Sequence, residues 1–174
     1  MSARSLKQKG FTLVEILIVV VILGILAAIV IPQFTSASEA AKASSMLTQL
    51  QSLRSQLELY QLQHNGDYPA SATADFWRQL TEETQADGTA ATATSQSFGP
   101  YLQKPARNAL NDNVNTANLP LIEASTASPL PDTGATTTNS FLYNATTGEI
   151  KAIVTVAQAQ AQNLDTANGD IVTE

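Results

Sequence analysis

The sequence contains no cysteine, which excludes both a disulfide framework and a zinc site built from thiolates. Histidine is almost as scarce, because His64 is the single example. Its place near the expected end of a helix favours a solvated or capping side chain over a metal ligand or a general base. A glycine-rich phosphate loop and a G-x-S-x-G nucleophile turn are also missing. These absences favour a protein without enzymatic activity and without a cofactor.

Basic residues are few: nine Lys and Arg stand against fifteen Asp and Glu, for a net charge of −6. Three of the nine (Arg4, Lys7 and Lys9) precede the first long apolar run. Their removal would take the formal charge to about −9. The remaining cations form no run that could neutralise phosphates, so nucleic acid is not expected as the main partner.

Charge is nearly absent from the segment Phe11–Phe34, where Glu15 is the only ionisable side chain. The segment is long enough for a helix that spans a bilayer, and the cations ahead of it favour a cytoplasmic start. An ordinary secretory signal peptide explains it less well. Such a peptide has an apolar region of about 7–15 residues that ends at a small-residue cleavage site, whereas the small residues here follow Pro32 and Phe34. We therefore expect a membrane helix.

Glu15 is the informative residue of this helix. A carboxylate within a bilayer costs about 2.5–3.5 kcal/mol on insertion scales, so a segment needed only as an anchor would have an apolar residue there. No Lys or Arg in the apolar run that follows offers a partner. A free α-amino group on a neighbouring subunit would supply one, if the chain were cleaved close to this point.

The heptapeptide Lys9–Glu15 (KGFTLVE), followed by the aliphatic run, resembles the N-terminal signal of type IV pilins and type II secretion pseudopilins. The resemblance implies that a prepilin peptidase cleaves after Gly10 and methylates the new terminal amine of Phe11. It implies further that Glu15 is needed for assembly and meets the N-terminus of an adjacent subunit.

The same resemblance implies a homo-oligomeric helical filament with minor pilins, built by an inner-membrane assembly platform and its ATPase. The subunit would wait in the bacterial inner membrane as a single-pass protein, with its leader cytoplasmic and its head periplasmic, and then enter a periplasmic or surface filament. Gly24 and Pro32 both weaken a continuous helix. Filaments of the family are commonly kinked or locally melted near these positions.

The helical pattern continues past Pro32 and becomes amphipathic. Its apolar stripe recurs at spacings of three and four residues: Met46, Leu50, Leu53, Leu57 and Tyr60. Asn65-Gly66 and Tyr68-Pro69 stop the pattern, so one helix is expected over Thr12–His64. The resulting division is a leader (1–10), a transmembrane or filament-core helix (11–34), an amphipathic continuation (35–65) and a globular head (66–174). The expected fold class is α+β and pilin-like, with the long helix packed against a small antiparallel sheet.

Within the head, the sequence predicts a short helix over Thr73–Gln85 and a compact aromatic turn over Phe98–Leu102. The low-complexity stretch Thr89–Ser97 reads as a flexible loop. A hairpin follows, with strands at Ser140–Tyr143 and around Ile150–Val156 joined by a turn at 144–148; Ile150, Ala152, Val154 and Val156 would share one face. Surface loops are expected at 108–118 and 125–139. Residues 157–162 receive no assignment, and the last residues look polar and frayed.

Calcium has to be considered because major pseudopilins often bind it in a C-terminal loop. Four carboxylates in polar segments could supply oxygen ligands: Asp112, Asp132, Asp165 and Asp170. None of them matches the EF-hand spacing, and the loop pattern of the family is absent. Solvated loop carboxylates are therefore the preferred interpretation, with calcium left as a possible ligand.

Three functions remain open from the sequence. A type II secretion pseudopilin is favoured by the absence of cysteine, by Tyr68-Pro69 at the helix exit, and by the G-P-Y-L and Thr-Gly-Glu turns. A type IV pilus subunit for adhesion, twitching or DNA uptake is the first alternative. A signal-anchored periplasmic binding domain is the second.

Overall fold

The computed structural model describes residues 10–92, 96–165 and 169–173. The long helix α1 (Leu13–Gln63) begins and ends within one residue of the predicted boundaries. It stops just before the predicted Asn65-Gly66 turn, where both residues have positive φ. The chain forms two compact units that divide between Ser38 and Glu39, inside this helix. Residues 1–9 of the expected leader, 93–95 of the expected loop, 166–168 and 174 lie outside the described residues.

Within the described residues, the N-terminal unit consists of Gly10–Thr12 and the apolar part of α1. Its large apolar side chains are all exposed, from 42% for Val30 to 84% for Phe11. α1 passes through Gly24 and Pro32 without a break. The kink or local melting expected there concerns an assembled filament and stays a prediction.

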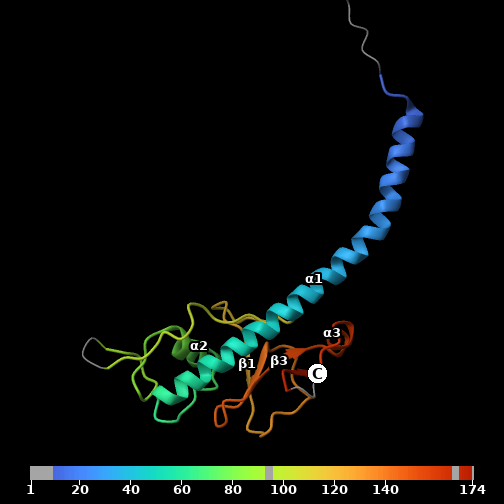
Figure 1. Cartoon of the computed structure of the whole chain (residues 1–174). Helices are drawn as coiled ribbons and strands as arrows, with labels where there is room; N and C mark the ends of the chain where they lie inside the picture. The colour runs from blue at the N-terminus through green and yellow to red at the C-terminus, as the bar shows by residue number, and fades with distance from the viewer. Residues whose placement is uncertain (1–9, 93–95, 166–168, 174) are drawn as a thin grey trace, which may run out of the picture. The chain divides into compact units, whose positions relative to one another are not determined.

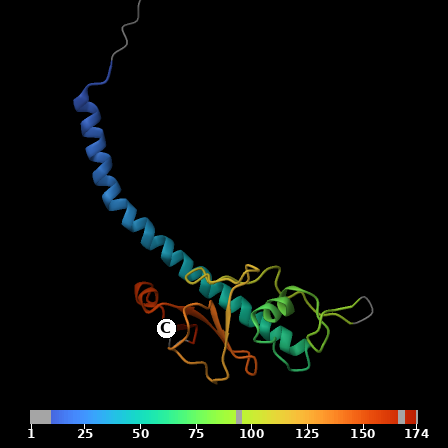
Figure 2. The same ribbon diagram turned by 180° about the vertical axis from the view of Figure 1, so that it is seen from behind.

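From Glu39 onward, α1 supplies the central element of the head. Its buried side chains are those of the predicted stripe, together with Ala43 one turn earlier. Every member of the stripe is 1% exposed or less, and all belong to one hydrophobic cluster with residues of the sheet and of helix α2 (Thr73–Thr81). Figures 1 and 2, drawn from opposite sides, both show this part of α1 crossing the sheet.

The sheet has four short strands in the order β1-β2-β3-β4: Ile122–Ala124, Phe141–Tyr143, Ile150–Val154 and Ile171–Thr173. The predicted hairpin is confirmed, because β2 and β3 pair in antiparallel fashion with Phe141 opposite Ala152. The sheet as a whole is mixed, since β1 runs parallel to β2 and β4 runs parallel to β3.

Both faces of the sheet are covered. On one face Tyr143, Ile150 and Ile171 pack with α1. On the other, a second cluster joins strand residues to the loop that follows β1: Leu130, Ala135, Leu142, Ile153 and Val172. All five residues of β3 are therefore buried, and no alternation of buried and exposed positions remains along this strand.

Several predicted boundaries were wrong. Helix α2 ends at Thr81 instead of Gln85, because Glu82 takes an extended conformation and Thr84 bridges to Phe98. Val156 leaves the strand pattern and begins helix α3 (Val156–Ala161), which occupies most of the stretch left without assignment. Thr155 starts this helix with a capping box that includes Gln158.

The C-terminal prediction also failed: Ile171–Thr173 are buried and form β4 rather than a frayed end. The loops at 108–118 and 125–139 are only partly superficial, since Asn108, Leu130 and Ala135 are buried. The aromatic turn is confirmed, because the N–H groups of Tyr101 and Leu102 both donate to the Leu80 carbonyl.

His64 is not solvated, because only 1% of it is exposed. Its Nδ1 lies 2.9 Å from the Tyr60 carbonyl oxygen and its Nε2 lies 2.9 Å from Thr84 Oγ1. The contact with a carbonyl of the last helical turn agrees with the capping alternative.

Candidate functional site

The predicted site residues lie at the N-terminus of α1, where the backbone changes from non-helical to helical. Gly10, Phe11 and Thr12 precede the helix, and all three are exposed. A peptidase needs an accessible, non-helical backbone on either side of the bond that it cleaves. The Gly10–Phe11 bond has both properties.

Glu15 is held by Thr12. The Thr12 N–H and hydroxyl each donate to Glu15 Oε2 at 2.8 Å, and the Glu15 N–H donates to Thr12 Oγ1 at 3.2 Å. The two residues thus form a reciprocal capping box, which satisfies N–H groups that the first helical turn leaves without partners. A carboxylate in the first turn also interacts favourably with the helix dipole.

The sequence analysis missed this contact, although its signal is present. Thr12-x-x-Glu15 ahead of an apolar run is the pattern of a capping box. Glu15 was treated as a carboxylate without a partner in its own chain. The structure provides one at short range, so part of the cost of placing this group beside hydrocarbon is offset before any second subunit is present.

Gly10 has open space around it. A Cβ built there would meet nothing within 4 Å, and the residue has no left-handed backbone that would require glycine. The chain itself therefore imposes no need for glycine at this position. Any requirement for Gly10 would come from a molecule that binds this segment.

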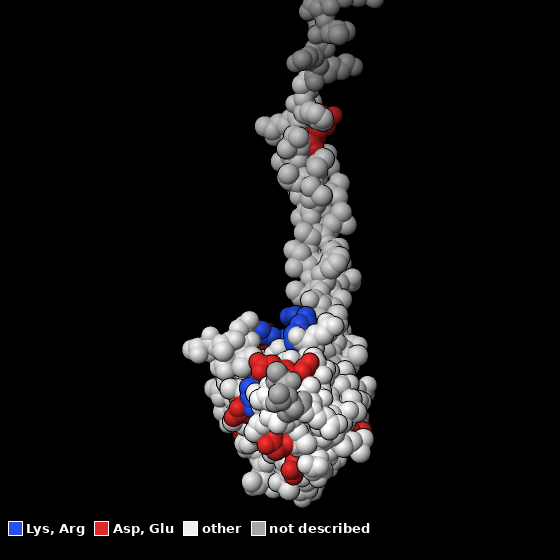
Figure 3. Space-filling model, turned by 90° about the vertical axis from the view of Figure 1, so that its left-hand side faces the viewer, with Lys and Arg blue, Asp and Glu red and all other residues white. Residues whose placement is uncertain are grey.

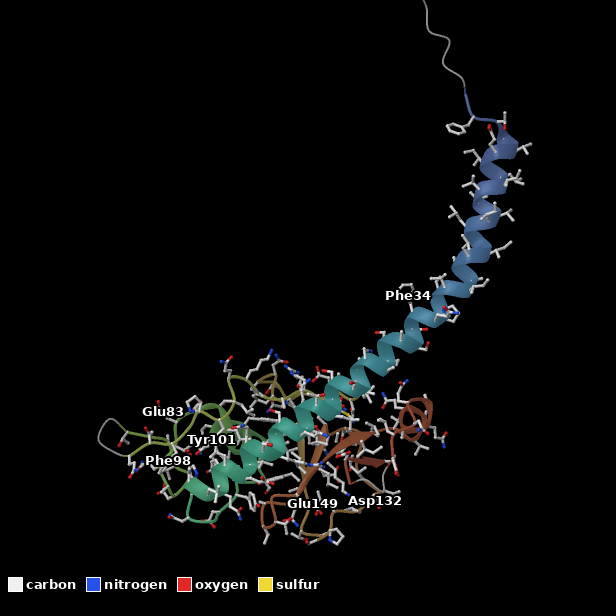
Figure 4. The ribbon with its side chains drawn as sticks, viewed as in Figure 1. Phe34, Glu83, Phe98, Tyr101, Asp132 and Glu149 are labelled. Atoms are coloured by element: carbon white, nitrogen blue, oxygen red, sulfur yellow. The ribbon has the colours of Figure 1, made fainter. Side chains whose placement is uncertain are left out.

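The exposed surface of α1 from Ile16 to Ile31 is apolar. Figure 3 shows a white shaft with one red group near its end, whereas Lys, Arg, Asp and Glu gather on the head. Phe34, labelled in Figure 4, projects from the helix and is 72% exposed. Within the described residues, α1 is the one helix long and apolar enough to cross a membrane. Such a surface needs lipid or other helices around it.

Three of the four candidate calcium ligands pair with cations of the chain. Asp112 lies 2.9 Å from Arg107, Asp132 lies 2.7 Å from Lys151, and Asp170 lies 2.6 Å from Arg54. The part of the chain that the structure describes holds no group of three or more His, Cys, Asp or Glu side chains placed to bind a metal ion. The structure does not bring the four aspartates together as one site.

One of the comparisons with known proteins falls on this N-terminal segment. Residues 5–31 match the family profile of the prokaryotic N-terminal methylation motif. Type II secretion system core protein G of Pseudomonas aeruginosa is 45% identical over 65 residues, which cover 37% of this chain and 45% of the relative. Core protein G of Dickeya chrysanthemi is 42% identical over 65 residues, or 37% of this chain and 42% of the relative.

A type IV major pilin protein of Neisseria gonorrhoeae is 33% identical over 100 residues, covering 53% of this chain and 55% of the pilin. The chain thus spans between about two fifths and just over half of the length of these relatives. No solved structure matches the chain.

The long apolar N-terminal helix and the small mixed sheet agree with an α+β, pilin-like fold. Residues 5–31 carry the prokaryotic N-terminal methylation motif, and parts of the chain are similar to type II secretion core protein G and to a type IV major pilin.

Proposed function

We propose that the chain is a structural subunit of a pilin-like filament and that it serves a type II secretion system as a pseudopilin. One observation carries the proposal: the segment Gly10–Glu15 stands in fixed register ahead of a helix whose apolar side chains are exposed all round. A subunit held first by lipid and then by neighbouring helices needs this kind of surface. The exchange is feasible because lipid chains and aliphatic side chains are similarly apolar.

In the proposed sequence of events, the chain spans the inner membrane with residues 1–10 in the cytoplasm and the head in the periplasm. A prepilin peptidase removes the leader after Gly10 and methylates Phe11. An assembly platform and its ATPase then move the subunit into the filament, which also contains minor pilins. The new amine of Phe11 would meet Glu15 of a neighbour and fix the position of one subunit against the next.

The capping box gives Glu15 two alternative sets of donors in this scheme. In the single subunit the carboxylate accepts hydrogen bonds from Thr12. In the filament it would gain the charged amine of another copy, so that both partners of the new hydrogen bond carry a charge and Coulomb attraction adds to the bond. That difference would favour the assembled state while leaving the free subunit tolerable in the bilayer.

The proposal is tested by replacing Gly10 and Glu15 separately. Gly10→Val should leave an unprocessed precursor that is folded normally, because a side chain at Gly10 meets no atom of the protein. Glu15→Ala should be processed and inserted, yet fail to enter filaments. Mass spectrometry of the N-terminus and filament yield are the measurements. Gly24→Ala, a glycine inside α1 with equal free space, is the control for the first variant.

A precursor that is still cleaved after Gly10→Val would remove the processing claim. Normal filament yield from Glu15→Ala would remove the assembly claim. An intact leader on the native protein would favour the signal-anchored binding domain instead.

A type IV pilus subunit is the second candidate. It is supported by the longer match to the gonococcal pilin, 100 residues against 65 for the secretion proteins. The higher identity of the secretion proteins, up to 45% against 33%, supports the first candidate. Deletion of the gene separates the two: loss of exoprotein release with surface fibres intact supports the pseudopilin, and the reverse supports the pilus subunit.

A further inference from the structure

We propose that Lys104 of one copy docks into a cleft beside Tyr68 of the next copy, so that the heads of adjacent subunits make a head-to-tail contact. This inference rests on the proposed function, because it names a surface through which copies in a filament would meet.

The cleft is a hollow of about 240 Å³ between α1 and the β2–β3 turn. Its lining residues are Arg54, Leu57, Glu58, Tyr68, Thr147, Gly148, Glu149 and Ile150. The ring of Tyr68 packs directly on Gly148, where a Cβ would collide with it. An aromatic ring that is half-buried therefore forms one wall of the cleft.

The charges at the cleft favour a cation. Arg54 is the only basic residue of the lining, and its guanidinium is committed to Asp170 at 2.6 Å and to the carbonyls of Ile150 and Gly169. Glu149 Oε2 accepts one hydrogen bond, from the Leu130 N–H at 2.8 Å. Glu58 is exposed and forms no hydrogen bond or ion pair with any described residue.

Two carboxylates and an aromatic face in one hollow suit an ammonium group. The carboxylates supply opposite charge, and the ring supplies a cation–π contact when the cation lies over its face. The pairing gains strength as the groups leave water together, which an interface between two copies would provide.

The same chain offers one such cation. Five of the described Lys and Arg residues form ion pairs within the head or along α1: Lys42, Arg54, Arg78, Arg107 and Lys151. Lys104 is exposed and forms none with the described residues. It borders a smaller hollow of about 120 Å³ together with Gln49, Ser52, Leu102, Pro105 and Ala106.

The two hollows lie on opposite sides of α1. Gln49 borders the Lys104 hollow and Glu58 borders the Tyr68 cleft. These positions are nine residues apart, about two and a half helical turns, so their side chains point in opposite directions. In Figure 4 the labelled Tyr101, close to Lys104 in sequence, and Glu149 likewise lie on opposite sides of the helix.

Opposite placement excludes a closed contact in which both copies use the same patch. Donor and acceptor surfaces on different sides of a subunit make a heterologous interface, which repeats from copy to copy and produces a ring or a helix. The offset between Gln49 and Glu58 along α1 corresponds to a stagger on the order of 10 Å between adjacent heads. The contact would thus fix the position of one head relative to the next, in addition to the packing between the apolar helices.

Site-directed cross-linking tests the contact, and the absence of native cysteine makes it clean. Two differently tagged full-length copies are expressed together, one with Lys104→Cys and the other with Glu58→Cys, and membranes are treated with a short bis-maleimide. We expect a heterodimer band at least tenfold stronger than that of the pair Lys104→Cys and Glu83→Cys. Glu83 is the matched control, because its carboxylate is also exposed and forms no hydrogen bond or ion pair with the described residues, and it lies away from Glu149 in Figure 4.

Charge reversal provides the second measurement. Lys104→Glu and Glu58→Lys should each lower filament yield at least fivefold, and the two together in one chain should restore it to within twofold of the parent. Glu83→Lys should leave the yield unchanged. Thermal unfolding of each variant shows whether a lower yield comes from a folding defect instead of a lost contact.

The outcomes separate this inference from the proposed function. If the tagged copies co-purify but the 104–58 cross-link is no stronger than the control, the head contact is wrong and the filament proposal stands. A cross-link between two Lys104→Cys copies alone would indicate a symmetric contact and also overturn the inference. If the copies do not co-purify at all, both proposals fail.

Discussion

The imidazole ring of His64 lies flat against the phenol ring of Tyr60, with the ring centroids 3.6 Å apart and the planes within 1°. Phe98 and Tyr101 meet the pair edge-on, so four aromatic rings close the end of α1. Tyr101 also donates its hydroxyl to Gln63 Oε1 at 2.6 Å. The cluster fastens the last turn of the helix to the loop that follows α2.

This cluster predicts a loss of stability in alkali. Burial raises the pKa of Tyr60 to about 12, and burial likewise raises the pKa of Tyr101 to about 12. Because the folded state holds these protons more tightly than the unfolded state, the contribution is fully present below about pH 10 and is lost as the pH rises towards 12. Denaturant unfolding followed across this range is the measurement.

The double variant Tyr60→Phe and Tyr101→Phe is the control for the alkaline effect. It should be less stable at neutral pH, since Gln63 loses its donor, but its stability should fall less steeply above pH 10. A residual slope is expected because burial also raises the pKa of Tyr143. An unchanged slope would show that other groups cause the alkaline loss.

We expect substitution of Gly88 to lower the free energy of unfolding. Its φ is +77°, and a Cβ there would lie 2.7 Å from Gln79 Nε2 and 2.9 Å from the Tyr60 hydroxyl oxygen. Gly88→Ala should therefore cost about 2–3 kcal/mol, part from the left-handed backbone and part from overpacking. Gly66→Ala has a similar φ of +95° with open space around it and should cost only about 1 kcal/mol. Equal losses in urea denaturation would contradict the packing argument.

Asn108 joins β2 to β3 from inside the head. Its Nδ2 donates to the Ser140 carbonyl at 2.9 Å and to the Ile153 carbonyl at 2.7 Å, and the side chain is fully buried. Asn108→Ala should destabilise the head by about 2–4 kcal/mol, because it removes a donor from two carbonyl groups and takes the Oδ1 acceptor from the N–H groups of Leu110 and Asn111. Gln103→Ala, at an exposed amide, should change the unfolding free energy by less than about 0.5 kcal/mol.

We expect substitutions of Thr12 to destabilise the first turn of α1 to different degrees. Thr12→Ser keeps a hydroxyl that can donate to Glu15, whereas Thr12→Val keeps the shape and removes the hydroxyl contacts. The valine variant should fray the first turn of α1 by about 1 kcal/mol and delay entry into filaments, and the serine variant should behave as the parent does. Helicity of this segment in detergent micelles, by NMR, is the direct measurement. Identical spectra for both variants would remove the role assigned to the hydroxyl.

The parts of the fold that follow from local pattern were predictable. The spacing of Leu50, Leu53 and Leu57 determines which face of α1 is buried, and the turn at 144–148 determines the β2–β3 hairpin. Both signals depend on neighbours close in the sequence. The apolar segment of α1 and the positions of Gly10 and Glu15 at its start could likewise be predicted from the sequence.

The parts that depend on distant partners were not predictable. Ile171–Thr173 is a β-branched run of only three residues in a polar C-terminal stretch, and it becomes a strand because β3 offers a parallel partner. Asn108 resembles a loop residue until Ser140 and Ile153 come within reach. Lys151 interrupts the apolar pattern of β3, yet it is 3% exposed because the Leu130 carbonyl and Asp132 bind its ammonium group.

The pairing of β3 with β4 has a consequence for synthesis. The head cannot finish folding until residues 171–173 have been made, because they complete the sheet beside Ala152 and Ile153. A nascent or clipped polypeptide that stops earlier would leave those backbone groups open, and an open strand edge invites pairing with other chains. Proteases would therefore degrade truncated chains before complete ones.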